Sequence, residues 1–129
     1  MTVVVDTSAL MAIVLEESAA QTCSLAIQTA DVLLISAATV AESLIVANRR
    51  SVGDAMSMLI NDLGFEIVPV SLASAKRVAQ IYAKWGKGIH PAALNFGDCF
   101  AYELAIENDC PLLFVGEDFA KTDVKRSIP

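Results

Sequence analysis

Short apolar runs alternate along the chain with longer stretches in which apolar residues recur every three or four positions. The apolar runs, rich in β-branched and large aliphatic residues, predict strands at 2–5, 32–35, 65–70 and 111–115. Helices are expected from 8 onward and over 17–30, 36 or 39 to 50, 51–64, 71–85 and 97–108. Because strands alternate with helices and hairpin signals are absent, the pattern predicts an α/β fold with a parallel sheet covered by helices on both sides.

The length and the apolar content together indicate one folded domain. The chain has 129 residues without a linker, a repeat or a low-complexity segment, so residues 1–129 are expected to form a single domain. With 55% hydrophobic and 19% charged residues the chain is too apolar for intrinsic disorder. The apolar runs are too short for a membrane span, and no Lys or Arg precedes Arg49, as the basic start of a secretory signal would require. The sequence therefore predicts a cytoplasmic protein without a membrane partner.

The charge and cysteine content narrow the function classes. A formal net charge of −6 argues against a non-specific nucleic-acid binder, because phosphate neutralisation needs cations. Any nucleic-acid partner must therefore meet a local basic patch or a metal ion. Cys23, Cys99 and Cys110 form no CxxC pair and are odd in number, so we expect buried thiols rather than disulfides or a zinc site.

Acidic residues follow the predicted strands at the points where ligands usually bind. In open parallel sheets the carboxyl ends of the strands line the ligand crevice. The acids near those ends are Asp6, Glu42, Asp98 and Asp118. Carboxylates in close contact repel one another, so their cluster is costly unless a cation lies in it. All-oxygen sites suit Mg²⁺ or Mn²⁺, and the chemistry expected of such a site is metal-assisted phosphodiester hydrolysis.

Each of these acids also has an ordinary structural interpretation. Most acids are solvated surface groups, and Asp6 could simply cap the helix that follows it. Glu42 and Asp98, however, lie among apolar residues, where an unpaired acid is expensive.

Segments spread over nearly the whole chain resemble one known family. They are Val-Val-Val-Asp-Thr-Ser-Ala-Leu from Val3, Ala-Glu-Ser-Leu around Glu42, Leu-Asn-Phe-Gly-Asp-Cys-Phe-Ala-Tyr from Leu94 and Pro-Leu-Leu-Phe-Val-Gly-Glu-Asp-Phe from Pro111. In this order they resemble the PIN-domain ribonucleases, specifically the VapC-type toxins of type II toxin–antitoxin systems. The resemblance implies a three-layer α/β/α domain with a small parallel sheet, an acidic Mg²⁺ or Mn²⁺ site, and endonucleolytic cleavage of RNA.

The resemblance also assigns site residues by position. Asp6, Glu42 and Asp98 match the first three acids of the family, with Thr7 or Ser8 as the hydroxyl neighbour of the first. Many PIN domains end their last core strand in Thr-x-Asp, and Gly116 stands here where that Asp would be.

Asp118 is therefore the best candidate for the fourth catalytic and metal-binding acid, with Glu117 and Asp123 as alternatives. Glu103 lies five residues beyond Asp98, a step that turns a helical side chain by about 140° net, so it should point away from the site.

The resemblance implies two partners, an RNA substrate (tRNA or another structured RNA) and a small VapB-type antitoxin. In the family it resembles, the antitoxin's peptide tail often inserts a basic residue into the acidic site.

Local positive charge occurs in three groups, at Arg49-Arg50, at Lys84, Lys87 and His90 with Tyr82 and Trp85 interleaved, and at Lys121, Lys125 and Arg126. For the second group the alternative is an amphipathic helix whose aromatic residues pack on the core. His90 is either a general acid or an exposed loop residue.

The cluster Met56, Met58, Leu59 and Ile60, together with residues 13–15, is more apolar than a small domain needs, which predicts a homodimer face or a partner groove. Two other functions stay open, an RNA-processing PIN nuclease without an antitoxin and a catalytically silent binding module. A response-regulator receiver is disfavoured, because Thr7 and Ser8 rather than a second acid follow Asp6.

Overall fold

The computed structural model describes residues 1–128 and contains a parallel sheet of four strands in the order β3-β2-β1-β4. The strands are β1 (Thr2–Val5), β2 (Val32–Ser36), β3 (Glu66–Val68) and β4 (Leu112–Leu113). The helices are α1 (Thr7–Val14), α2 (Ala20–Thr29), α3 (Ala37–Arg49), α4 (Gly53–Asp62), α5 (Leu72–Trp85) and α6 (Phe96–Glu107), followed by the 3₁₀ helix η1 (Phe119–Lys121). In register, Val3 pairs with Leu33 and Val4 with Leu112.

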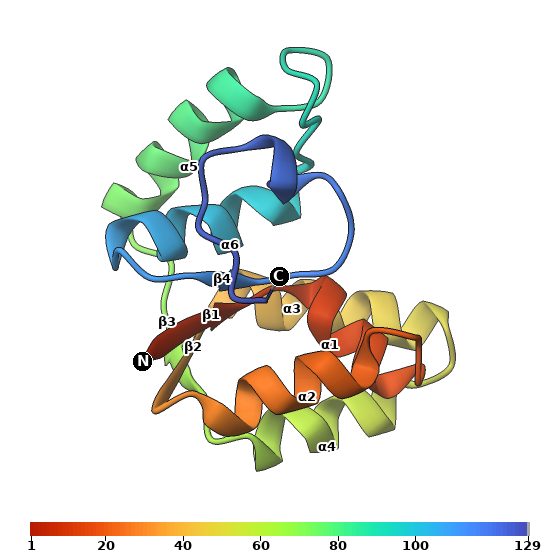
Figure 1. The fold of residues 1–129 in the computed structure, drawn as a ribbon. Coiled ribbons are helices and arrows are strands. Elements are labelled where there is room, and N and C mark those ends of the chain that lie inside the picture. Colours follow the sequence, from red (N-terminus) through yellow and green to blue (C-terminus); the bar gives the residue numbers. More distant parts are fainter. Residues whose placement is uncertain (129) are drawn as a thin grey trace.

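The sheet divides the apolar core into two layers, as the alternation of side chains along a strand requires. Val4, Leu34 and Leu112 face α5, α6 and the C-terminal segment, whereas Val3, Val5 and Leu113 face α1, α2 and α4. Figure 1 shows α5 and α6 on one side of the sheet and α1, α2 and α4 on the other. The expected three-layer α/β/α architecture is confirmed.

Helices begin directly after the carboxyl ends of β1 and β2, which determines where polar side chains gather. Asp6 caps α1 and Ser36 caps α3, each by accepting a hydrogen bond from a backbone N–H in the first turn. On the other side of the sheet, Asn95 caps α6 in a reciprocal capping box with Asp98. The starts of these helices therefore lie near one edge of the sheet.

The last strand differs most from the sequence prediction, because β4 covers Leu112–Leu113 rather than 111–115. After Val115 the chain turns through η1 and returns beside β4, where Leu112 forms an isolated parallel bridge with Arg126. The amide of Leu112 donates to the carbonyl of Lys125 (2.8 Å), and that of Ser127 donates to Leu112 (3.0 Å). The end of the chain thus covers the β4 edge, an element that its sequence, lacking periodicity, did not predict.

The apolar excess predicted around Met56 is mostly core. Met56 and Ile60 are buried beneath the sheet, and Leu59 and residues 13–15 are partly buried against the same cluster, so only Met58 is largely exposed. The prediction that this region forms a partner surface is wrong for Met56 and Ile60, because α4 uses them to pack in the core.

Exposed apolar side chains gather instead over α3, α5 and α6, where Ile45, Tyr82 and Phe96 are exposed. Among the residues described, no helix has the length and apolar character needed to cross a membrane.

Candidate active site

Asp6 is the most buried of the predicted site acids, with 3% of its surface exposed. Its Oδ2 accepts two hydrogen bonds from Ser8, one from the backbone N–H (3.0 Å) and one from the hydroxyl (2.6 Å). The other oxygen, Oδ1, is buried without a hydrogen-bond partner. The pKa of Asp6 is raised to about 6, mainly by burial and also by the negative charge of Glu42, against the opposing hydrogen bonds from Ser8.

Ser8 connects this carboxylate to the neighbouring strand end. Besides donating to Asp6, its hydroxyl accepts a hydrogen bond from the backbone N–H of Val115 (3.0 Å), just beyond β4. The side chain of Asp6 is thus oriented by a group that also holds the chain on the way to Asp118.

Glu42 is held between the beginnings of two helices from opposite faces of the sheet. Its Oε1 accepts a hydrogen bond from the hydroxyl of Thr7 (2.6 Å), which also lies 3.0 Å from the Ser43 hydroxyl. Its Oε2 lies against Gly97, the residue before Asp98. Thr7 therefore positions Glu42, whereas Ser8 positions Asp6.

Asp98 lies in the first turn of α6 and has the most perturbed carboxyl group of the site. Its Oδ2 accepts a hydrogen bond from the backbone N–H of Asn95 (2.9 Å). The pKa of Asp98 is raised to about 7, mainly by burial and also by the negative charges of Asp6, Glu42 and Asp118. The charges of the other three predicted acids therefore all act on Asp98, although Asp118 itself is exposed to solvent.

Asp123 and Glu103, two of the other candidates for the fourth acid, have partners elsewhere. Asp123 accepts a hydrogen bond from the hydroxyl of Tyr102. Glu103 is buried and pairs with Arg77, whose Nε lies 2.9 Å from Oε2 of Glu103. Glu103 thus faces α5, in agreement with the expected turn away from the site, and Asp118 is the acid of the last loop that acts electrostatically on Asp98.

The carboxylate oxygens of the site are the kind of ligand that a hard divalent cation such as Mg²⁺ prefers. The free, buried Oδ1 of Asp6 and the raised pKa of both aspartates are what a carboxylate site without a cation shows. Within residues 1–128, however, no group of three or more His, Cys, Asp and Glu side chains is already arranged to hold a metal ion. The ligand roles of Asp6, Glu42, Asp98 and Asp118 therefore stay predictions.

The basic groups differ in their surroundings. Arg49 lines a hollow of about 420 Å³ beside the site, together with Glu42, Phe96 and Gly97. Arg126 instead stacks on the ring of Phe114 at 4.6 Å, and Lys125 pairs with Asp109. Arg49 is thus a cation beside the site that an anionic substrate could meet.

Trp85 and His90 take part in local packing. The two rings meet edge to face at 4.6 Å, Trp85 also packs on Tyr102 at 6.2 Å, and the Nδ1 of His90 accepts a hydrogen bond from the amide of Ala92 (3.0 Å). The structure favours the packing interpretation over RNA stacking for Trp85, whereas Tyr82 is exposed. His90 has a role in the loop before α6.

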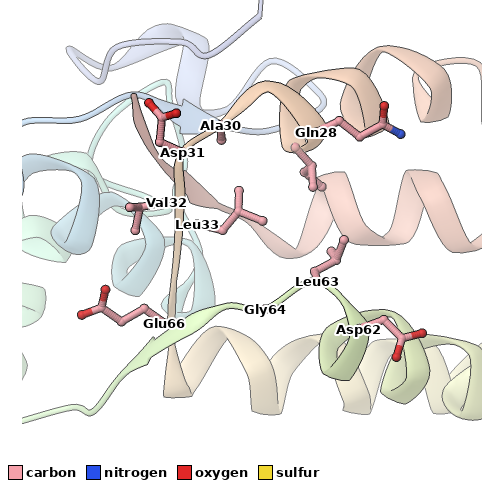
Figure 2. Close-up of a pocket in the computed structure, with 10 residues that line it drawn as sticks. Gln28, Ala30, Asp31, Val32, Leu33, Asp62, Leu63, Gly64 and Glu66 are labelled. Atoms are coloured by element: carbon pink, nitrogen blue, oxygen red, sulfur yellow. The ribbon is translucent and has the colours of Figure 1, made fainter.

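A hollow of about 440 Å³ lies at the other end of the strands, where β2 and β3 begin. Figure 2 shows Asp31, Asp62 and Glu66 spread around its rim rather than converging on one point. Its position separates it from the cluster of Asp6 and Asp98.

Comparison with known proteins agrees with this architecture. The family model described as "PIN domain" matches residues 3–125. Ribonuclease VapC28 of Mycobacterium tuberculosis is 40% identical over 129 residues, covering 97% of each chain.

Two solved structures share the fold. That of VapC20 from Mycobacterium tuberculosis, described as a sarcin–ricin loop cleaving toxin, superposes with a TM-score of 0.81 at 14% identity, covering 98% of this chain and 99% of that one. VapBC2 of Rickettsia felis, bound to a promoter DNA fragment, gives 0.69 at 15% identity over 98% and 96% of the two chains. The chain therefore belongs to the PIN-domain family, among the VapC ribonucleases.

Proposed function

We propose that the protein is a metal-dependent endoribonuclease toxin that cleaves RNA phosphodiester bonds and is neutralised by a cognate antitoxin. The observation that carries the proposal is the pair Asp6 and Asp98, two acids with raised pKa at the carboxyl edge of the sheet, one of them with a buried, unpartnered oxygen. Two acids in such surroundings are unfavourable in an inert domain and useful in a site that binds a cation.

Two kinds of residue make up the proposed site, carboxylates that would hold the ion and hydroxyls that orient them. Asp6 and Asp98 would hold Mg²⁺ or Mn²⁺, with Glu42 and Asp118 completing the acidic shell. When bound, such an ion supplies a hydroxide nucleophile from water and neutralises charge on the phosphoryl oxygens. Ser8 and Thr7 keep Asp6 and Glu42 in fixed orientations through their hydrogen bonds.

Arg49 is suited to contact a substrate phosphate, because it lines the hollow that Glu42 borders. An RNA substrate, tRNA or another structured RNA, would meet this local positive charge despite the net charge of −6.

The partner we propose is a small antitoxin of the VapB type. A basic side chain from it would satisfy the same carboxylates that otherwise bind the ion, since a guanidinium matches a carboxylate in charge and geometry. We also propose a homodimer, formed over the exposed apolar residues of α3, α5 and α6, where Phe96 is 71% exposed.

The test is RNA cleavage by the purified protein with Mg²⁺ or Mn²⁺, compared with Asp6→Asn and Asp98→Asn variants. Both variants should lose cleavage by on the order of 100-fold or more, since each loses a charge that would hold the ion. Asp62→Asn is the matched control, because Asp62 is an exposed acid at the far end of the sheet.

Cleavage by Asp98→Asn at the parent rate would refute the proposal. Cleavage without an antitoxin frame beside the native gene would favour the RNA-processing nuclease, and the absence of both cleavage and ion binding would favour a silent binding module.

A further inference from the structure

Tyr102 lies one helical turn beyond Asp98 on α6 and contacts a segment distant in sequence. Its ring is buried, with 5% of the residue exposed, and packs beside Trp85. Its hydroxyl donates a hydrogen bond to Oδ1 of Asp123, across 21 residues of sequence. A buried phenol needs such a partner, but this one joins α6 to the loop that carries Asp118.

That loop is anchored in a second way. Phe119, which follows Asp118 directly, is buried in the core at 5.2 Å from Phe114. Between Phe119 and Asp123, the Thr122 amide and hydroxyl both donate to the carbonyl of Phe119, at 3.0 and 2.7 Å. The segment from Asp118 to Asp123 is therefore a compact turn whose two ends are attached to the protein by Phe119 and by Asp123.

Asp118 has no such attachment of its own. Its exposed side chain caps no helix, and within residues 1–128 it is not among the hydrogen-bonded side chains. Where its carboxylate lies relative to Asp98 is consequently decided by the turn. Because α6 supplies both Asp98 and Tyr102, one rigid helix places the first acid and holds the segment that presents the second.

We propose that Tyr102 is a positioning residue that acts through Asp123 to keep Asp118 beside Asp98 in the ion-binding site. This inference rests on the proposed function, because it concerns the same acidic shell. In this proposal Asp123, which the sequence offered as a candidate for the fourth acid, holds Asp118 in place and does not bind the ion.

The experiment measures Mn²⁺ binding by titration calorimetry and amide hydrogen exchange of residues 116–124. Tyr102→Phe keeps the ring and removes only the hydroxyl. We expect Mn²⁺ to bind about tenfold more weakly, as for loss of a residue that orients a ligand, and exchange to accelerate over 116–124. Tyr82→Phe, which alters the only other tyrosine of the chain, is the matched control and should change neither quantity.

Two further variants distinguish positioning from a general structural role. Asp123→Asn keeps an oxygen acceptor for the Tyr102 hydroxyl and should bind Mn²⁺ nearly as the parent does, whereas Asp123→Ala should resemble Tyr102→Phe. If Tyr102 acts through Asp118, adding Tyr102→Phe to Asp118→Asn should weaken Mn²⁺ binding no further.

Additive losses in that double variant, or parental affinity in Tyr102→Phe, would overturn the proposal. The exchange measurement needs neither metal nor RNA, so it tests the attachment of the turn even if the parent protein fails to cleave RNA. Unchanged exchange over 116–124 in Tyr102→Phe would likewise overturn it.

Discussion

The carboxylate of Glu42 occupies the space that a side chain at position 97 would need. A Cβ built on Gly97 would lie 1.8 Å from Oε2 of Glu42, closer than any real contact between these atoms. The α3 acid and the start of α6 thus approach each other only because residue 97 has no side chain. This contact brings Glu42 next to Asp98 from the other side of the sheet.

Gly97→Ala should therefore disrupt the site. The methyl group forces Glu42 away from its position, and a displacement of about 1 Å in a catalytic arrangement costs on the order of 100-fold in rate. Metal-dependent RNA cleavage by the purified variant measures this loss, with circular dichroism to verify that the fold is retained.

The same substitution should be harmless once the carboxylate is gone. In a Glu42→Ala background, Gly97→Ala should leave the free energy of unfolding unchanged or raise it by about 0.5–1 kcal/mol, since alanine is the better residue in a helix. A large further destabilisation of the double variant would mean that the methyl group meets something other than Glu42.

The metal-free protein should become less stable as pH rises from about 4 to about 7. Asp6 and Asp98 have pKa values raised from 3.8 to about 6 and about 7 in the folded chain, so between these limits the folded state binds more protons than the unfolded state. The free energy of unfolding then decreases with increasing pH. Urea denaturation in EDTA at pH 5 and pH 8 measures the difference.

Asp98→Asn should reduce that pH dependence and raise the melting temperature of the metal-free protein at pH 8 by a few degrees. The amide removes one of the mutually repelling charges while keeping the side chain's shape. Asp62→Asn serves again as the control, and an equal gain from it would assign the effect to overall net charge instead of the site.

The ion pair between Arg77 and Glu103 should matter for stability and not for cleavage. Arg77→Met leaves the buried carboxylate of Glu103 without its partner, which should cost about 1–3 kcal/mol of the free energy of unfolding. Lys76→Met removes an exposed cation from the same helix and should cost far less. Both values come from urea denaturation.

Glu103→Gln should cleave RNA at the parent rate per folded molecule, because Glu103 faces α5. A loss of cleavage by Glu103→Gln comparable with that of Asp98→Asn would place Glu103 in the site after all.

Phe96→Ser should weaken the proposed homodimer, because Phe96 is 71% exposed between two apolar hollows of α3, α5 and α6. We expect the dissociation constant to rise by at least about tenfold, as for an aromatic residue central to an interface. Analytical ultracentrifugation over a concentration series measures it. Leu25→Ser on α2, where Leu25 is 60% exposed, is the control, and a dimer weakened only by that variant would move the interface to the other face.

The sequence by itself determined the order of the elements and the edge at which the acids gather. Val3, Val4 and Val5 predict a buried strand because they are apolar on both faces, and the structure buries all three, with alternate side chains in the two core layers. Once the sheet is parallel, Asp6 must lie at its carboxyl edge.

Only the tertiary structure decided how these acids are held and which other acids are used elsewhere. The hydrogen bond of Asp123 to Tyr102 and the pairing of Glu103 with Arg77 depend on contacts across 21 and 26 residues, which local periodicity does not encode. The sequence could not predict the burial of Met56 for the same reason, because an apolar helix face has the same pattern whether it packs on its own core or on a partner. Periodicity reports which side of an element is apolar, whereas the partner on that side follows from how the whole chain packs.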